Sequence, residues 1–280
     1  MLRRAFKEER LPAWFRWICA AEGIAFWMHL AERGLARHLD DRARARELMA
    51  RAARVAFERR YSILRQTLSD LPALEARPDA LAIVMMGLYP GPIFRVLDWI
   101  LGALRARGLR ARLEARRWLA PLDAQRRWEE VTVHLGELLV CLTEELRAAE
   151  VPQASYVLGQ LSYDFGVRLT RLIRFLLRMP HSTESAIEVL RMGEYLFRVN
   201  PEHHSGVDGA TGYIEGNACP WYMRPGWGAM HCGIFGRFQD GCSSVFGLNY
   251  RLTRTIPRHG GDICRIELKP IRLRKRPAST

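Results

Sequence analysis

Apolar residues recur every three or four positions through most of the first two hundred residues of the chain. That spacing places them on one face of a helix, so the pattern predicts a succession of amphipathic helices. Asp40-Asp41 opens one of these segments and Asp123 caps another. Ser185 and Glu188 have the spacing of a capping box, although a start of that helix two or three residues earlier is an alternative. The predicted helices cover residues 41–68, 78–89, 93–107, 123–149, 154–178 and about 185–199.

The predicted helix over residues 154–178 has a strongly basic face. Its apolar stripe consists of Leu158, Leu161, Phe165, Leu169, Leu172 and Leu176, and its other face carries Arg168, Arg171, Arg174 and Arg178. A basic stripe of this kind can face a membrane surface or an acidic partner. Solvent is the more common neighbour of a charged helix face, so we expect the arginines to lie in water.

From Gly206 onward, the helical spacing gives way to patterns typical of β-strands. Residues 212–218 read as a short strand, and residues 248–254 alternate between apolar and polar positions. Alternation resumes over residues 263–268 after a Gly260-Gly261 turn, which predicts a β-hairpin. Residues 243–246, just before the hairpin, are expected to form a helical turn. The chain is therefore predicted to be α+β, with a helical bundle over residues 1–200 packed on a small antiparallel sheet within residues 201–280, in one integrated domain.

Charge and cysteine content narrow the classes of protein. The formal net charge is +13, but the arginines are spread over most helices instead of clustering with aromatic residues, so nucleic-acid binding is not indicated. Arg95 and Asp98 interrupt the longest apolar stretch, and the first residues do not resemble a secretory signal, so we expect no transmembrane segment. Six cysteines without a signal fit a protein of the reducing cytoplasm. The sequence leaves open whether the chain forms a homo-oligomer.

The last third of the chain contains enough nitrogen and sulfur ligands for a metal site. Candidate ligands for a divalent metal such as zinc or iron are Cys219, Cys232, Cys264, His203 and His204. Their spacings are long and irregular, and no Cys-x-x-Cys or His-x-x-x-His pair supplies a local chelate. The alternative is that the thiols are structural, with Cys264 packed in the core.

The same cysteines could act in catalysis. Cys219 precedes a proline at the end of a strand, and Cys232 follows His231, which could help to lower its pKa. A thiolate beside a general base can attack a C=N or C=O carbon. The residues available as base or orienting group are His231, His259, Asp240 and Glu215.

A third candidate constellation lies in the predicted helix over residues 123–149. Glu130, His134, Glu137 and Glu144 share one helix face there, as carboxylate-bridged di-iron bundles require. Such a centre needs a second helix with a matching Glu/His pair, and the sequence offers none. We therefore expect this face to be an exposed polar surface.

One stretch near the C-terminus resembles a known family. The residues concerned are Cys219-Pro220, Cys232, the strand 248–255 and the closing Gly260-Gly-Asp-Ile-Cys264. They resemble the L-2-amino-thiazoline-4-carboxylic acid hydrolase-like family over about fifty residues. The resemblance implies a helical portion paired with a small antiparallel sheet, and hydrolytic opening of a cyclic thiazoline. The architecture also looks similar to the vinyl-reductase-like small-molecule-binding domain, whose pocket would hold a ligand without turning it over.

These observations lead to two hypotheses. The first is a hydrolase or lyase acting on a small sulfur- or nitrogen-containing heterocycle or C=N bond, that is, on carbon–nitrogen bonds other than peptide bonds. The residues expected to bind its small-molecule substrate are Arg224, Arg251, Trp221, Trp227 and Tyr250, with the arginines anchoring a carboxylate. The second is a sensory or accessory module that binds a small molecule or a metal without catalysis.

Overall fold

The computed structural model describes residues 2–68, 122–222, 224–256 and 262–271, and it is mostly helical with one small sheet. The helices are α1 (Leu2–Lys7), α2 (Ala13–Leu39), α3 (Arg42–Thr67), α7 (Ala124–Ala148), α8 (Ala154–Leu176), α9 (Thr183–Leu196) and α10 (Ala229–Ser244). The strands are β1 (His203–Asp208), β2 (Thr211–Gly216), β3 (Leu248–Arg254) and β4 (Cys264–Pro270). This composition confirms the α+β class. The helices predicted over residues 78–89 and 93–107 lie outside the described residues.

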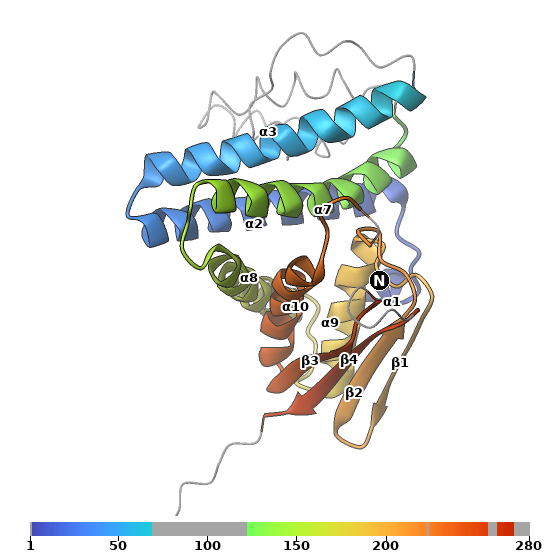
Figure 1. The fold of residues 1–280 in the computed structure, drawn as a ribbon. Coiled ribbons are helices and arrows are strands. Elements are labelled where there is room, and N and C mark those ends of the chain that lie inside the picture. Colours follow the sequence, from blue (N-terminus) through green and yellow to red (C-terminus); the bar gives the residue numbers. More distant parts are fainter. Residues whose placement is uncertain (1, 69–121, 223, 257–261, 272–280) are drawn as a thin grey trace, which may run out of the picture.

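Three long helices, α2, α3 and α7, lie side by side as the upper layer of the molecule (Figure 1). Aspartates begin two of them, as predicted. The Arg44 N–H donates to Asp41 Oδ1 at 2.9 Å at the start of α3, and the Arg126 N–H donates to Asp123 Oδ1 at 2.8 Å at the start of α7. Because many of their contacting positions are alanines or leucines that are fully buried, the three helices form one continuous apolar core.

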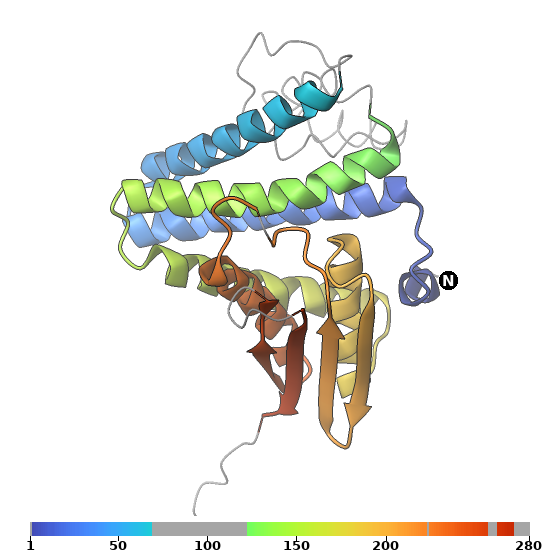
Figure 2. The same ribbon diagram turned by 45° about the vertical axis from the view of Figure 1, so that its right-hand side comes forward.

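Helices α8 and α10 lie below this layer and pack closely on each other (Figure 2). Two glycines permit the close approach. A Cβ at Gly166 of α8 would lie 2.2 Å from the Phe238 carbonyl oxygen, and a Cβ at Gly241 of α10 would lie 2.2 Å from the Tyr163 carbonyl oxygen. Since both obstacles are backbone atoms, any larger residue at either position would push the helices apart.

The sheet has the strand order β1-β2-β4-β3, and all neighbours are antiparallel. The predicted pairing of residues 248–254 with the last strand is confirmed, with Tyr250 opposite Leu268. One face of the sheet is covered by α9 and α10, and its buried side chains form a second apolar core with Ile187 and Leu190 of α9. The sheet side chains in that core include Ile214, Ile266 and Leu268.

The structure adds three details to the predictions for this region. Helix α10 spans sixteen residues, where only a helical turn at 243–246 was expected. Its three glycines weaken the helical pattern in the sequence, and packing on α8 compensates for their low helix propensity. Strand β1 was not predicted, since an edge strand with no buried residue shows no clear alternation of apolar and polar positions. Helix α9 follows the alternative of an earlier start: it begins at Thr183 and is capped by Ser182, whose Oγ accepts from the Ser185 N–H at 3.2 Å.

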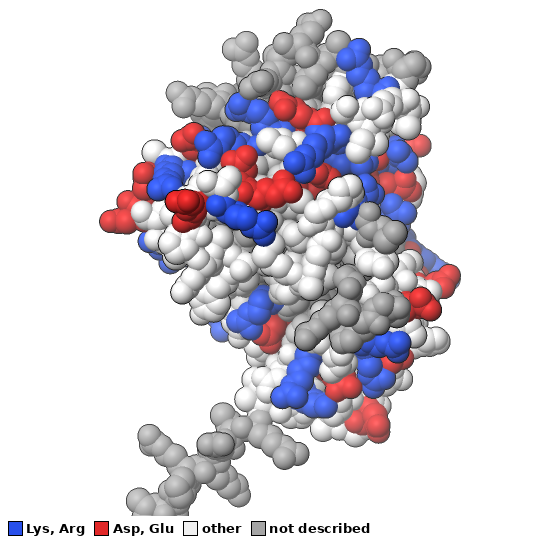
Figure 3. Space-filling view, in the orientation of Figure 1, with Lys and Arg blue, Asp and Glu red and all other residues white. Residues whose placement is uncertain are grey.

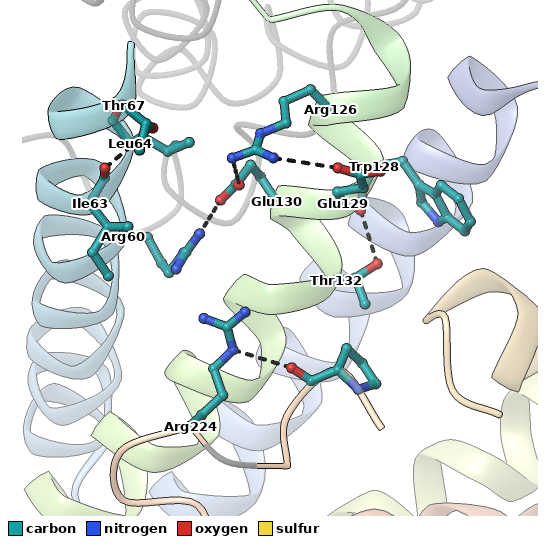
Figure 4. A network of polar contacts seen from close by, with 11 residues as sticks. Arg60, Ile63, Leu64, Thr67, Arg126, Trp128, Glu129, Glu130, Thr132 and Arg224 are labelled. Carbon is teal, nitrogen blue, oxygen red and sulfur yellow. Dashed lines mark hydrogen bonds and ion pairs between the residues drawn. The ribbon is translucent and has the colours of Figure 1, made fainter. Parts of the chain in front are cut away.

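Three of the four residues on the polar face of α7 are buried, contrary to the expectation, whereas Glu144 is exposed as expected. Glu130, His134 and Glu137 are each less than one-tenth exposed, because arginines of α3 lie against them. The Arg60 guanidinium donates to Glu130 Oε2 at 2.6 Å (Figure 4), and Arg59 donates to Glu137 Oε1 at 3.2 Å. Ion pairing therefore lets this face contribute to the interface between α3 and α7.

Charge is distributed unevenly over the surface. On the face shown in Figure 3, acidic and basic side chains intermingle over the upper helical layer, whereas uncharged side chains dominate around α8 and α10. Within the described part of the chain, no helix combines the length and the apolar character needed to cross a bilayer.

Candidate functional site

Three cysteines from separate elements line one small cavity enclosed by α9, α10 and the sheet. Cys219 lies in the segment after β2, Cys232 in the first turns of α10, and Cys264 at the start of β4. The volume of this cysteine cavity is about 60 Å³, which is room for a few water molecules. Its other lining residues include Trp221, Trp227 and Tyr250, three of the side chains expected to bind substrate.

Burial makes these thiols poor nucleophiles at neutral pH. It raises the pKa of Cys219 to about 11, and it also raises the pKa of Cys232 and of Cys264. The thiolate is the nucleophilic form of cysteine, and little of it exists at pH 7 when the pKa is this high. The cavity as it stands therefore holds neutral thiols.

We expect Cys219 to be alkylated by iodoacetamide slowly at pH 7 and progressively faster as the pH rises toward 11. A pKa of about 11 in place of the ordinary 9.0 leaves about a hundredfold less thiolate at pH 7. Peptide mapping by mass spectrometry would measure the rate, with the guanidinium-unfolded chain as the reference for an accessible thiol. Rapid labelling of folded Cys219 at pH 7 would contradict the assignment of a neutral thiol.

His231 is buried and turned toward α7 instead of toward a cysteine. Its Nδ1 accepts from the Gly228 N–H at 3.1 Å, so Nε2 carries the proton and lies 2.9 Å from Thr143 Oγ1. The ring also stacks on Trp227, with ring centroids 5.1 Å apart. Burial lowers the pKa of His231. With both nitrogens engaged and the ring outside the cysteine cavity, this imidazole ties α10 to α7 and is not placed to activate Cys232.

Two other expected site residues also lie away from the cysteine cavity. Asp240 forms an ion pair with Arg237 one turn earlier on α10, and burial raises its pKa. Arg251 is exposed on the outer face of the sheet, since it alternates with Tyr250 along β3. It is therefore separated by the sheet itself from the thiols. His259, the remaining candidate base, lies outside the described residues.

The candidate metal ligands do not form a metal centre. His203 and His204 lie on the edge strand β1, and neither lines the cavity that holds the three cysteines. Among the described residues, no three His, Cys, Asp or Glu side chains are arranged to hold a metal ion. The geometry therefore gives no support to a zinc or iron site in this part of the chain.

A buried carboxyl group that was not among the expected residues of the cysteine site borders the cysteine cavity. Glu194 of α9 is only 1% exposed. Arg191 donates to its Oε2 at 2.6 Å, and Asn200 donates to its Oε1 at 3.1 Å. The network continues where Tyr250 donates to Gln239 Oε1 at 2.7 Å. The only sequence signal was the Arg191-x-x-Glu194 spacing on one helix face, which is common on exposed helices.

A groove with an excess of positive charge lies on the other side of Cys219. Its volume is about 610 Å³, and its charged lining residues are Glu9, Arg16, Arg191, Arg198 and Arg224. The Arg16 guanidinium lies 3.7 Å from the centroid of the Trp128 ring. Arg224 donates from Nε to the Pro220 carbonyl oxygen at 3.2 Å (Figure 4), and burial lowers its pKa. This arginine groove can attract an anion such as a carboxylate or phosphate.

A large apolar cavity lies between α2, α8, α9 and α10, with a volume of about 570 Å³. Its lining is almost entirely aliphatic and aromatic, and Ser162 accepts a hydrogen bond from Trp27 Nε1 at 3.0 Å. The cavity reaches the surface beside Leu2, Phe26 and Leu176, which line it and are themselves exposed. Its size and lining are typical of a site for a small apolar molecule.

Comparison with known proteins adds no assignment: no protein-family model, curated protein or solved structure matches this chain. The function must therefore be argued from the site geometry.

Proposed function

We propose that this protein binds a small, largely apolar molecule in the cavity between α2, α8, α9 and α10 and acts as a ligand-binding module. The observation that carries the proposal is the combination of a volume of about 570 Å³ with a lining that is almost wholly apolar. Left empty, such a space forfeits the dispersion contacts that interiors normally make. A ligand that fills it would restore them, and the resemblance to vinyl-reductase-like binding domains points the same way.

The lining also limits the chemistry of the ligand. The buried polar side chains offered are hydroxyls, Ser162 and Thr170, and Ser162 already accepts a hydrogen bond from Trp27. Glu22 is the one charged side chain among the described lining residues, so it disfavours an anionic group in the cavity. The ligand that fits best is a hydrocarbon or aromatic molecule with at most one neutral polar group.

Titration of the purified protein with an environment-sensitive apolar dye such as Nile red tests the proposal. We expect saturable binding to one site, with displacement by small aromatic or aliphatic competitors. A competitor present at a free concentration of a hundred times its Kd should add about 2.7 kcal/mol to the free energy of unfolding. Dye fluorescence that rises linearly without saturation, and no thermal shift, would count against the cavity as a binding site.

A second candidate is the hydrolase suggested by the thiazoline resemblance. It is favoured by one observation: Cys219 lines both the cysteine cavity and the arginine groove, where Arg224 could hold a substrate carboxylate. The raised pKa of Cys219 means that substrate binding would have to change the surroundings of the thiol before it could attack.

Incubation with 2-amino-thiazoline-4-carboxylate, followed by chromatographic detection of ring opening, tests the hydrolase candidate. Cys219→Ser should lose turnover, while Cys141→Ser, which changes a buried thiol of α7 that lines neither the groove nor the cysteine cavity, should keep it. Unchanged turnover in both Cys219→Ser and Cys232→Ser would remove the thiol mechanism.

We place the protein in the cytoplasm as part of this proposal. All six cysteines are unpaired, including the three that share one cavity. A reducing compartment keeps such neighbouring thiols from oxidising.

A further inference from the structure

The C-terminal half of α8 exposes large apolar side chains that a folded protein would normally bury. Leu172 is 54% exposed, Phe175 is 79% exposed and Leu176 is 64% exposed. Two of them belong to the apolar stripe that the sequence pattern assigns to the buried face of this helix. Single exposed leucines are common, but three neighbours at i, i+3 and i+4 form a contiguous patch, and such patches mark interaction sites.

Exposed arginines adjoin this patch along the chain: Arg168 and Arg171 lie within α8, and Arg178 lies just beyond its C-terminal end. Arg168, Arg171 and Arg178 are all exposed, and none of them forms an ion pair with a described residue. The sequence contains no acidic residue between Asp164 and Glu184, so the positive charge of this segment is uncompensated along the helix. We call the three apolar residues and these three arginines together the α8 surface.

The α8 surface is continuous with the mouth of the apolar cavity. Leu176 belongs to both, and the rim continues through Phe26 of α2 and Leu2 of α1, each 44% exposed. The Phe26 ring packs edge-on against Phe165 of α8, with ring centroids 5.6 Å apart, so the two helices present one joined apolar rim. A partner that covers the α8 surface would therefore also face the cavity mouth.

We propose that the α8 surface docks on an anionic lipid bilayer, with Leu172, Phe175 and Leu176 in the acyl boundary and the arginines on lipid phosphates. Helices that lie in a bilayer interface combine Phe and Leu on one side with Lys or Arg on the other. Guanidinium groups bind phosphate through paired hydrogen bonds, and their aliphatic stems can pack along the apolar surface.

Charge argues against a second copy of this chain as the occupant. A symmetric dimer through the α8 surface would bring two sets of three arginines together without any acidic residue from the same stretch to offset them. An anionic bilayer instead supplies phosphates for all three arginines and hydrocarbon for the three apolar side chains. Docking does not depend on whether the cavity holds a ligand. It would place the cavity mouth against the bilayer, which is a source of apolar molecules.

Flotation with phosphatidylcholine vesicles, with and without about one-third phosphatidylglycerol, tests the proposal. We expect the full chain to float with the anionic vesicles and not with the neutral ones, and this binding should weaken as salt rises. Phe175→Glu/Leu176→Glu should reduce the fraction bound at least tenfold. Arg171→Gln/Arg178→Gln should weaken binding about thirtyfold.

The control variants make the same types of substitution outside the α8 surface. Tyr156→Glu alters a 68% exposed aromatic residue at the other end of α8, and Arg42→Gln/Arg46→Gln removes the same charge from α3; both should bind like wild type. Nile red titration without vesicles reports separately on the cavity, and circular dichroism reports on folding. Wild-type protein that does not float, or α8 variants that float as well as the controls, would overturn the proposal. A concentration-dependent dimer that the α8 variants abolish would do the same, because it would identify a protein interface instead.

Discussion

Replacing Gly193 with leucine should abolish binding of an apolar probe while leaving the protein at least as stable as the wild type. Gly193 lies in α9 and lines the apolar cavity, and the nearest atom to a Cβ built there is Phe238 Cε1 at 3.9 Å. A leucine side chain would therefore extend into the cavity without displacing a neighbour. Glycine disfavours a helix by about 0.5–1 kcal/mol relative to alanine, and leucine is nearly as good a helix former as alanine, so the substitution also favours α9. Nile red titration should show affinity at least about a hundredfold weaker, since the probe and the leucine need the same volume.

The control for this experiment is Gly233→Leu in α10. Gly233 is exposed, has no atom within 4 Å of a built Cβ, and does not line the apolar cavity. The same substitution there should leave probe binding unchanged. Gly23→Leu, on the α2 wall of the cavity, should repeat the loss seen with Gly193→Leu. Equal probe binding by Gly193→Leu and wild type would show that the probe occupies some other site.

Local signals in the sequence were sufficient to predict the helices that have both a regular apolar stripe and a capping residue. Asp123 begins α7 and Asp41 begins α3, as their positions indicate. Helix α10 lacks such signals, because Gly233, Gly236 and Gly241 interrupt its pattern, and one of these glycines serves the contact with α8. The helix is stabilised by tertiary packing that a single sequence does not display.

The sites were harder to predict than the fold, because they depend on contacts between distant residues. Cys219, Cys232 and Cys264 line one cavity although they come from three separate segments, and the orientation of His231 is set by Thr143, eighty-eight residues away. The apolar cavity gave no sequence signal at all. Its walls come from several helices. In the sequence of each helix, the apolar residues that line the cavity cannot be distinguished from those that pack in the core.

His134 should make this protein unusually sensitive to mild acid. It is buried between α3 and α7, and neither ring nitrogen forms a hydrogen bond with a described residue. Burial, with a smaller contribution from Arg60, lowers its pKa from 6.5 to about 4. As the pH falls from 6.5 toward 4, the unfolded chain takes up a proton that the folded chain does not, so the free energy of unfolding decreases. This one group should account for a loss of about 3 kcal/mol across that range.

His134→Leu should remove that loss, because leucine is similar in size and carries no titratable group. The variant should also be more stable than wild type at pH 7 by about 1–2 kcal/mol, since it no longer buries two ring nitrogens that lack a hydrogen-bond partner among the described residues. Urea unfolding at pH 7, 5.5 and 4.5 measures both effects, and His29→Gln, which changes an exposed histidine of α2, is the control. Carboxylates also contribute to acid unfolding. The decisive quantity is therefore the difference between His134→Leu and wild type in the slope of the free energy of unfolding against pH. Parallel stability curves for the two proteins between pH 7 and 4.5 would show that His134 is not the source of the acid sensitivity.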